Sequence, residues 1–93
     1  MNRTTQTILA LSNKIQNLIS QLHDKEPENK TFEQEGMLNG STIVQEYFDE
    51  GEYGLAAEHL LYMVYESEIS YPKEIVEELT NLSDQYKIKN PYF

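Results

Sequence analysis

Apolar residues near the start of the chain recur every three or four positions, the spacing of one face of a helix. The residues between them are Ser, Asn, Gln and Lys, so the opposite face is polar and nearly neutral. Thr4 or Thr5 is expected to be the N-cap, because a threonine hydroxyl accepts a hydrogen bond from an amide of the first turn. Two heptads are too few to indicate a coiled coil, and a core-facing helix is favoured. The expected buried stripe consists of Ile8, Leu11, Ile15, Leu18 and Leu22, with Ile19 beside them.

The pattern changes after this first helix. Residues 23–30 are polar and include a proline, which predicts a loop. Residues 31–34 read Thr-Phe-Glu-Gln, the spacing of a capping box in which the glutamine side chain reaches back to the threonine amide. A short helix is therefore expected from Thr31 through Leu38.

A second helical pattern covers residues 41–50 and ends before Gly51, which suits the left-handed position that follows a helix. The Asn-Gly-Ser sequence at residues 39–41 is expected to break or bend the chain. The pattern leaves open whether residues 31–50 form one kinked helix or two short ones, and we favour a break at Gly40.

The clearest helix follows the short connection from Gly51 to Gly54. Its adjacent alanines, Ala56 and Ala57, allow a neighbouring helix to approach closely. The expected core face consists of Leu55, Ala56, His59, Leu60, Met63 and Val64.

The last helix is expected to begin at Pro72 with Ser70 as its N-cap, because proline suits the first helical position. Glutamates in its first turns and Lys87 and Lys89 at its end suit the helix dipole. Residues 90–93 are expected to leave the helix and to pack two aromatic rings onto the bundle. The expected buried stripe consists of Ile75, Leu79, Leu82 and Tyr86, with Val76 alongside.

These elements predict one all-α domain over residues 1–93, a small bundle of four to five helices. There is no cysteine, so packing alone must hold the fold, as suits a reducing compartment. No apolar run approaches the roughly 20 residues of a membrane span or forms a signal-peptide core. We therefore expect a soluble cytoplasmic protein.

Charge separates the two halves of the chain. The net charge is −9, yet residues 1–23 contain two basic residues and no acid. Between Glu46 and Glu78 there are ten acidic residues against the single Lys73. A charge of this sign repels nucleic acid and anionic membranes and attracts basic partners.

Catalytic chemistry is not indicated. The two histidines, His23 and His59, belong to no zinc-binding motif and suit a helix end and the edge of a core. The acidic clusters are expected to face solvent. Catalytic carboxylates instead need different environments that separate their pKa values. Gly51 and Gly54 form a GxxG sequence flanked by acids, which disfavours RNA binding. We expect no enzyme, no metal or other cofactor, and no nucleic-acid partner.

A surface that binds protein is the better hypothesis. Four tyrosines are interleaved with acids from Tyr53 to Tyr71, and such rings provide contact area while carboxylates attract Lys or Arg. For each tyrosine the alternative is a place at the edge of the core with its hydroxyl in water. The expected partner-binding residues are Asp49, Glu50, Glu52, Glu58, Tyr62, Tyr65, Glu66 and Glu68.

The stretch from Phe48 to Tyr86 resembles a known family, over about forty of the 93 residues. The residues that carry the resemblance are GEYGLAAEHL at 51–60, Tyr65-Glu66, Ile69, Pro72-Lys73-Glu74 and a last helix through Leu82. This pattern resembles the MafI-like immunity proteins, which are similar to some immunity proteins (CdiI-type) of bacterial contact-dependent growth inhibition systems.

The resemblance implies a small helical protein that neutralises one cognate toxin domain in the cytosol, often a ribonuclease. It also implies that Gly51 ends a helix and that Gly54 and Ala56 permit close packing. Leu55 and Leu60 would fill the core. The family assigns no toxin contacts, so the expected contact residues rest on charge and facing alone.

The expected function is therefore an immunity protein whose acidic helical surface occludes the active site of a basic nuclease toxin. The alternative is a helical adaptor or regulatory module that binds a partner peptide, or a homodimer joined through the first helix. The oligomeric state is left open.

Overall fold

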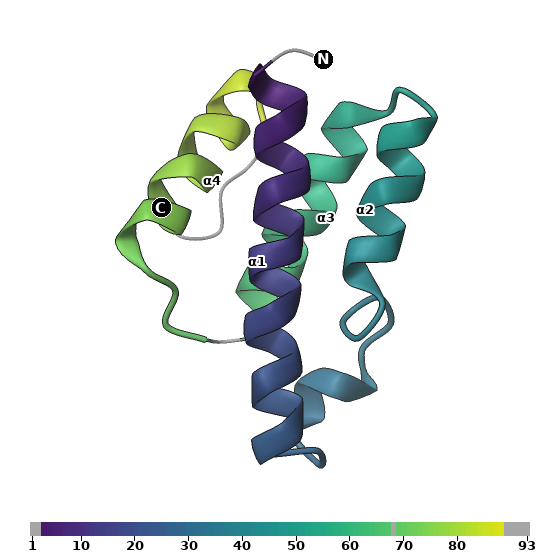
Figure 1. The fold of residues 1–93 in the computed structure, drawn as a ribbon, viewed down its shortest axis with the longest axis vertical. Coiled ribbons are helices and arrows are strands. Elements are labelled where there is room, and N and C mark those ends of the chain that lie inside the picture. Colours follow the sequence, from purple (N-terminus) through teal and green to yellow (C-terminus); the bar gives the residue numbers. More distant parts are fainter. Residues whose placement is uncertain (1–2, 68, 89–93) are drawn as a thin grey trace.

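The computed structural model describes residues 3–67 and 69–88, and within these ranges every regular element is a helix (Figure 1). The all-α prediction is confirmed. The elements are α1 (Arg3–Lys25), the 3₁₀ helix η1 (Lys30–Glu33), α2 (Gly40–Asp49), α3 (Tyr53–Ser67) and α4 (Lys73–Gln85).

Helix α3 is the element around which the others pack. It contacts α1, α2 and α4, while α1 also contacts α2. In Figure 1 the long helix α1 crosses in front of α3, with α2 and α4 on opposite sides. One apolar core joins all four α-helices, and its largest fully buried side chains are Ile8, Leu11, Ile15, Ile19, Met37, Val44, Leu60, Met63, Val64 and Leu79.

The buried stripe of α1 is slightly rotated from the predicted one. Ile19 is fully buried, whereas Leu18 and Leu22 are only half-buried at the edge of the core. The core side of α1 therefore runs through Ile8, Leu11, Ile15 and Ile19.

Helix α1 is longer than predicted at both ends. It begins at Arg3, so Thr4 and Thr5 lie inside the helix, and the predicted N-cap at either residue is wrong. It continues to Lys25, into the predicted loop of residues 23–30.

The predicted capping box at residues 31–34 is also wrong. Asn29 caps η1, its side-chain oxygen accepting from the Thr31 amide at 3.0 Å. The Thr31 hydroxyl donates instead to the Glu66 carbonyl at 2.7 Å. That carbonyl lies in the last turn of α3, where the helix has no internal donor for it. A contact between distant segments thus replaces the local cap, and Gln34 becomes the C-cap of a single 3₁₀ turn.

The segment between η1 and α2 is held by side chains rather than by a helix. The Gln16 amide group donates to the Met37 carbonyl at 3.1 Å and accepts from the Ser41 amide at 2.8 Å. Met37 itself is fully buried. The short helix predicted through Leu38 is therefore absent, and α2 begins at Gly40, the favoured break. A side-chain carbon at Gly40 would overlap the buried Met63, so glycine permits this close approach of α2 to α3.

The turn from α2 to α3 confirms the prediction for Gly51. Its φ is +77°, in the left-handed region. The Glu52 amide donates to the Tyr47 carbonyl at 2.8 Å, and the Gly51 amide donates to the Phe48 carbonyl at 3.0 Å. This pair of bonds is a Schellman motif, which satisfies carbonyls at the end of α2 and allows α3 to begin at Tyr53.

Helix α4 begins at Lys73, one residue after the predicted first position at Pro72. Pro72 is the N-cap and makes no side-chain hydrogen bond, so the expected cap at Ser70 is wrong. The Pro72 carbonyl accepts from the amides of Ile75 and Val76 at 3.0 and 3.2 Å. Ile75, Leu79 and Leu82 are buried as expected, whereas Tyr86 is only half-buried. Lys89 and residues 90–93 lie outside the described residues.

No helix in the described part of the chain is both long enough and apolar enough to cross a membrane.

Replacing Gly36 by Ala is expected to cost more stability than replacing Gly51 by Ala. Both residues have left-handed φ, +81° and +77°, so both variants carry backbone strain of about 1 kcal/mol. At Gly36 the new carbon would also lie 2.7 Å from Cε1 of His59, whereas nothing lies within 4 Å at Gly51. We expect a loss of about 2–3 kcal/mol for Gly36→Ala and about 1 kcal/mol for Gly51→Ala, measured by urea unfolding. Equal losses would contradict the packing of His59 against Gly36.

Candidate functional site

One side of α3 faces solvent and carries half of the eight predicted contact residues. Glu58, Tyr62, Tyr65 and Glu66 are three or four residues apart, so they share a face of the helix, and α1, α2 and α4 cover its other sides. Glu58 is exposed, Glu66 is half-buried, and Tyr65 is 55% exposed. We call this the acidic face, defined as Glu58, Tyr62, Tyr65 and Glu66 together with Leu55.

Leu55 was missed as a surface residue. It was expected in the core, but its side chain is 41% exposed. Ala56 and Leu60 of the same helix are buried as expected. Because the three neighbouring helices pack on the other sides of α3, Leu55 is left next to Glu58 on the open side. An exposed leucine among carboxylates gives the acidic face an apolar contact point.

The close-packing role implied for Gly54 is not required by the structure. A side-chain carbon at this position would lie 3.8 Å from the Tyr86 ring, which is an ordinary van der Waals distance. The space beside Gly54 belongs instead to the depression described below.

The acids of the α2–α3 turn lie at the N-terminal end of α3. Asp49, Glu50 and Glu52 are all exposed. Asp49 accepts a hydrogen bond from the Gln45 side chain at 2.9 Å. Glu52 borders the same depression as Leu55 and Glu58, so the structure joins this part of the turn to the acidic face. Glu68 lies outside the described residues.

Tyr62 is anchored to the fold rather than free. Its hydroxyl donates to the Glu35 carbonyl at 2.9 Å, and its ring packs against the core. Burial, with the nearby carboxylates of Glu66 and Glu35, raises the pKa of the Tyr62 hydroxyl. Glu35 thus adds negative charge to the acidic face from a segment that the sequence pattern assigned to a helix. Of the two tyrosines expected on this face, Tyr65 is the more exposed.

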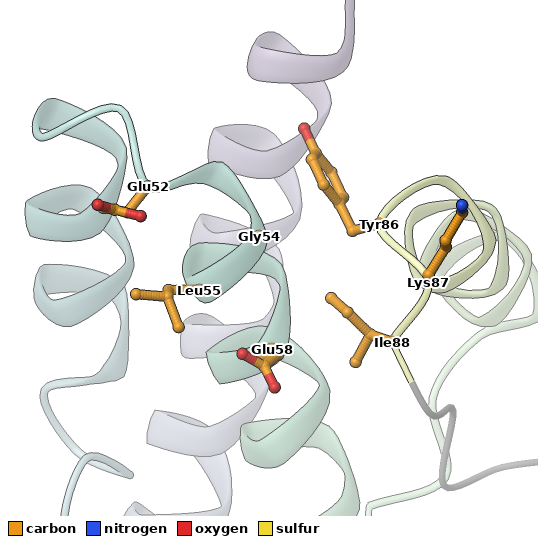
Figure 2. Close-up of a pocket in the computed structure, with 7 residues that line it drawn as sticks. All are labelled: Glu52, Gly54, Leu55, Glu58, Tyr86, Lys87 and Ile88. Carbon is orange, nitrogen blue, oxygen red and sulfur yellow. The ribbon is translucent and has the colours of Figure 1, made fainter.

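The acidic face ends in a depression between the start of α3 and the end of α4 (Figure 2). Its volume is about 400 Å³. Figure 2 shows Glu58 on α3 across from Tyr86 and Ile88 at the end of α4. The lining residues are Glu52, Gly54, Leu55, Glu58, Tyr86, Lys87 and Ile88.

A Schellman motif at the end of α4 places Tyr86, Lys87 and Ile88 in the lining of this depression. The Ile88 amide donates to the Ser83 carbonyl at 2.8 Å, and the Lys87 amide donates to the Asp84 carbonyl at 3.3 Å. Lys87 takes the left-handed position with φ of 54°, where glycine is usual. The chain reverses there and directs Ile88 back toward α3.

The carboxylates of the acidic face have no basic partner within the described residues. There the only ion pair joins Lys73 and Glu77, at 3.7 Å between Nζ and Oε1, on the exposed side of α4. The charges of Glu52, Glu58 and Glu66 are therefore not neutralised by the fold. With a net charge of −9, they attract a basic surface over several ångströms.

The two histidines have packing roles. The His23 ring meets Phe32 edge-on, with centroids 4.8 Å apart. His59 Nε2 lies 3.1 Å from the Gly36 carbonyl, and since a carbonyl only accepts, Nε2 carries the proton. Burial lowers the pKa of His59. Among the described residues, no group of three or more His, Cys, Asp or Glu side chains is placed to hold a metal ion.

Comparison with protein-family models, with curated protein sequences and with solved structures gives no match to this chain. The resemblance to immunity proteins therefore stays a prediction.

Acidification is expected to remove a stabilising contribution from His59. Its pKa is lowered in the folded state, so below the ordinary value of 6.5 the unfolded chain binds a proton that the folded chain resists. Stability is thus lost as pH falls through that value. Wild type should be more stable than His59→Gln at about pH 8, and the gap in free energy of unfolding should narrow toward about pH 5. Urea unfolding of both proteins across this range tests it, and a constant gap would contradict it.

Proposed function

We propose that this chain is an immunity protein that binds a basic nuclease toxin domain through the acidic face of α3 and covers its active site. One observation carries the proposal. Leu55 and Tyr65, two of the exposed large apolar side chains, lie on the same helix face as carboxylates that no described cation neutralises. Apolar anchors surrounded by unpaired charge are typical of tight interfaces with a partner of opposite sign.

The rigidity of α3 supports the same conclusion. Because this helix packs against α1, α2 and α4, its side chains lie on a backbone that is already ordered before binding. Tyr62 is further fixed by its hydrogen bond to Glu35. A preordered surface loses little conformational entropy on association, so more of the contact energy remains as affinity.

The charge of a nuclease explains why an acidic face suits this target. A ribonuclease must attract polyanionic RNA, so its active-site cleft is positive. Carboxylates on a convex helix match such a cleft, and long-range attraction speeds the encounter. The predicted resemblance of residues 48–86 to MafI-like immunity proteins is the reason for expecting a toxin as the partner.

The alternative is a helical adaptor or regulatory module. A homodimer through the apolar stripe of α1 would conflict with the core, since Ile8, Leu11 and Ile15 are already buried within one chain. The unpaired carboxylates of α3 favour a basic partner over a second acidic copy.

Reversing two charges of the acidic face is expected to abolish protection. The Glu58→Lys/Glu66→Lys variant places cations against a basic cleft, which we expect to slow association by about tenfold or more and to remove its salt dependence. The measurement is growth of cells that express a nuclease toxin domain that wild type neutralises, sought first among the genes next to this one, with association rates by stopped-flow at low and high salt.

The matched control is Asp24→Lys/Glu28→Lys. These exposed acids lie at the end of α1 and in the following loop, and their reversal changes the net charge by the same amount. The control should protect nearly as well as wild type. Equal protection by both double variants, or the lack of a toxin domain that wild type neutralises, would overturn the proposal.

A further inference from the structure

The depression between α3 and α4 combines apolar, aromatic and charged lining residues. Tyr86 and Ile88 form its α4 wall and Gly54 lies on its α3 side, while Leu55 borders it from the side of α3 that faces α2 (Figure 2). Gly54 contributes no side chain, and a carbon added there would lie 3.8 Å from the Tyr86 ring, which also lines the depression. These groups give apolar and aromatic contact to an aliphatic stem or a planar cation.

Two carboxylates stand at the edge of this depression. Glu52 and Glu58 are both exposed and form no ion pair with a described cation. The one cation of the lining, Lys87, extends beside α4 and away from Glu58 (Figure 2). The left-handed backbone of Lys87 fixes this direction, because it turns Ile88 inward and Lys87 outward. The open side of the depression therefore remains negative.

We infer that the depression between the start of α3 and the end of α4 receives an arginine side chain of the toxin domain. The inference rests on the proposed function and names the anchor that the basic partner supplies. The guanidinium plane stacks against Tyr86 while its N–H groups donate to Glu58, and the stem contacts Ile88. Arginine fits better than lysine, because its planar, weakly hydrated group stacks on a ring and donates in a fixed geometry.

Other occupants fit this chemistry less well. An apolar side chain would remove water from Glu52 and Glu58 without replacing their hydrogen bonds. An acidic side chain would find one lysine that points outward and two carboxylates at the entrance. An arginine satisfies the carboxylates and uses the apolar wall at the same time.

A titration with a small probe tests the depression itself. N-acetyl-arginine amide is added to ¹⁵N-labelled protein at physiological salt, and amide shifts are followed by NMR. The neutral N-acetyl-citrulline amide and the anionic N-acetyl-glutamate amide are the matched controls. We expect saturable shifts at Gly54, Glu58 and Ile88 for arginine alone, with a dissociation constant on the order of 10 mM.

Two variants and one control test whether the arginine probe binds in the depression. Glu58→Gln is expected to weaken arginine binding by about fivefold, since it removes a charged acceptor. Gly54→Gln keeps the net charge, favours the helix and fills the space beside Tyr86, so it should abolish the saturable shifts. Glu66→Gln, elsewhere on the acidic face, should leave them unchanged. Equal effects of Glu58→Gln and Glu66→Gln, or equal shifts with citrulline, would overturn the inference.

The complex with the toxin domain separates this inference from the proposed function. Gly54→Gln and Glu58→Gln should each raise the dissociation constant by about tenfold, while Asp24→Asn should not change it. If charge reversal on the acidic face abolishes protection but these two variants bind normally, the function stands and the arginine anchor is wrong. If the arginine probe binds but no toxin domain does, the proposed function is wrong and the guanidinium site stands alone.

Discussion

The fold depends on the burial of α3 by three other helices. Most helices in small proteins bury one face, but α3 is covered by α1, α2 and α4, with residues such as Ala57, Leu60 and Met63 buried on different sides. The small residues at Ala56 and Gly40 allow the close approach that this arrangement needs. Only one narrow side of α3 remains for solvent. Everything that the chain presents to a partner from its central helix must fit on that side.

The helices that could be predicted from sequence are those whose signals are local. The spacing of apolar residues predicted all four α-helices of the described residues, and Gly51 marked the end of α2 because glycine readily adopts the left-handed conformation that follows a helix. The helix predicted for residues 31–38 is absent for a physical reason. The Thr31 hydroxyl bonds to the Glu66 carbonyl, and Gln16 of α1 holds both Met37 and Ser41. Such contacts join residues far apart in the chain, so no local pattern contains them.

Part of the candidate site could likewise be predicted from local sequence patterns, and part could not. Charge and helical spacing placed Glu58, Tyr65 and Glu66 together, because residues three or four apart on a helix share a face. The sequence did not reveal that Leu55 is exposed or that Tyr86 and Ile88 line the same depression as Leu55. Those facts depend on where α4 ends relative to α3. A stripe of apolar residues shows that a helix is buried, but it does not show which residue remains outside once three neighbours are in place.

Helix α4 is expected to detach from the domain at lower free energy than α3. Helix α4 packs mainly against α3, whereas α3 is held from three sides. Amides in the middle of α3 should therefore exchange hydrogen only when the whole domain unfolds, while those of α4 exchange through partial detachment. Detachment removes Tyr86 and Ile88 from the depression and leaves the acidic face in place. One half of the surface is thus as persistent as the fold, and the other half opens and closes at lower free energy.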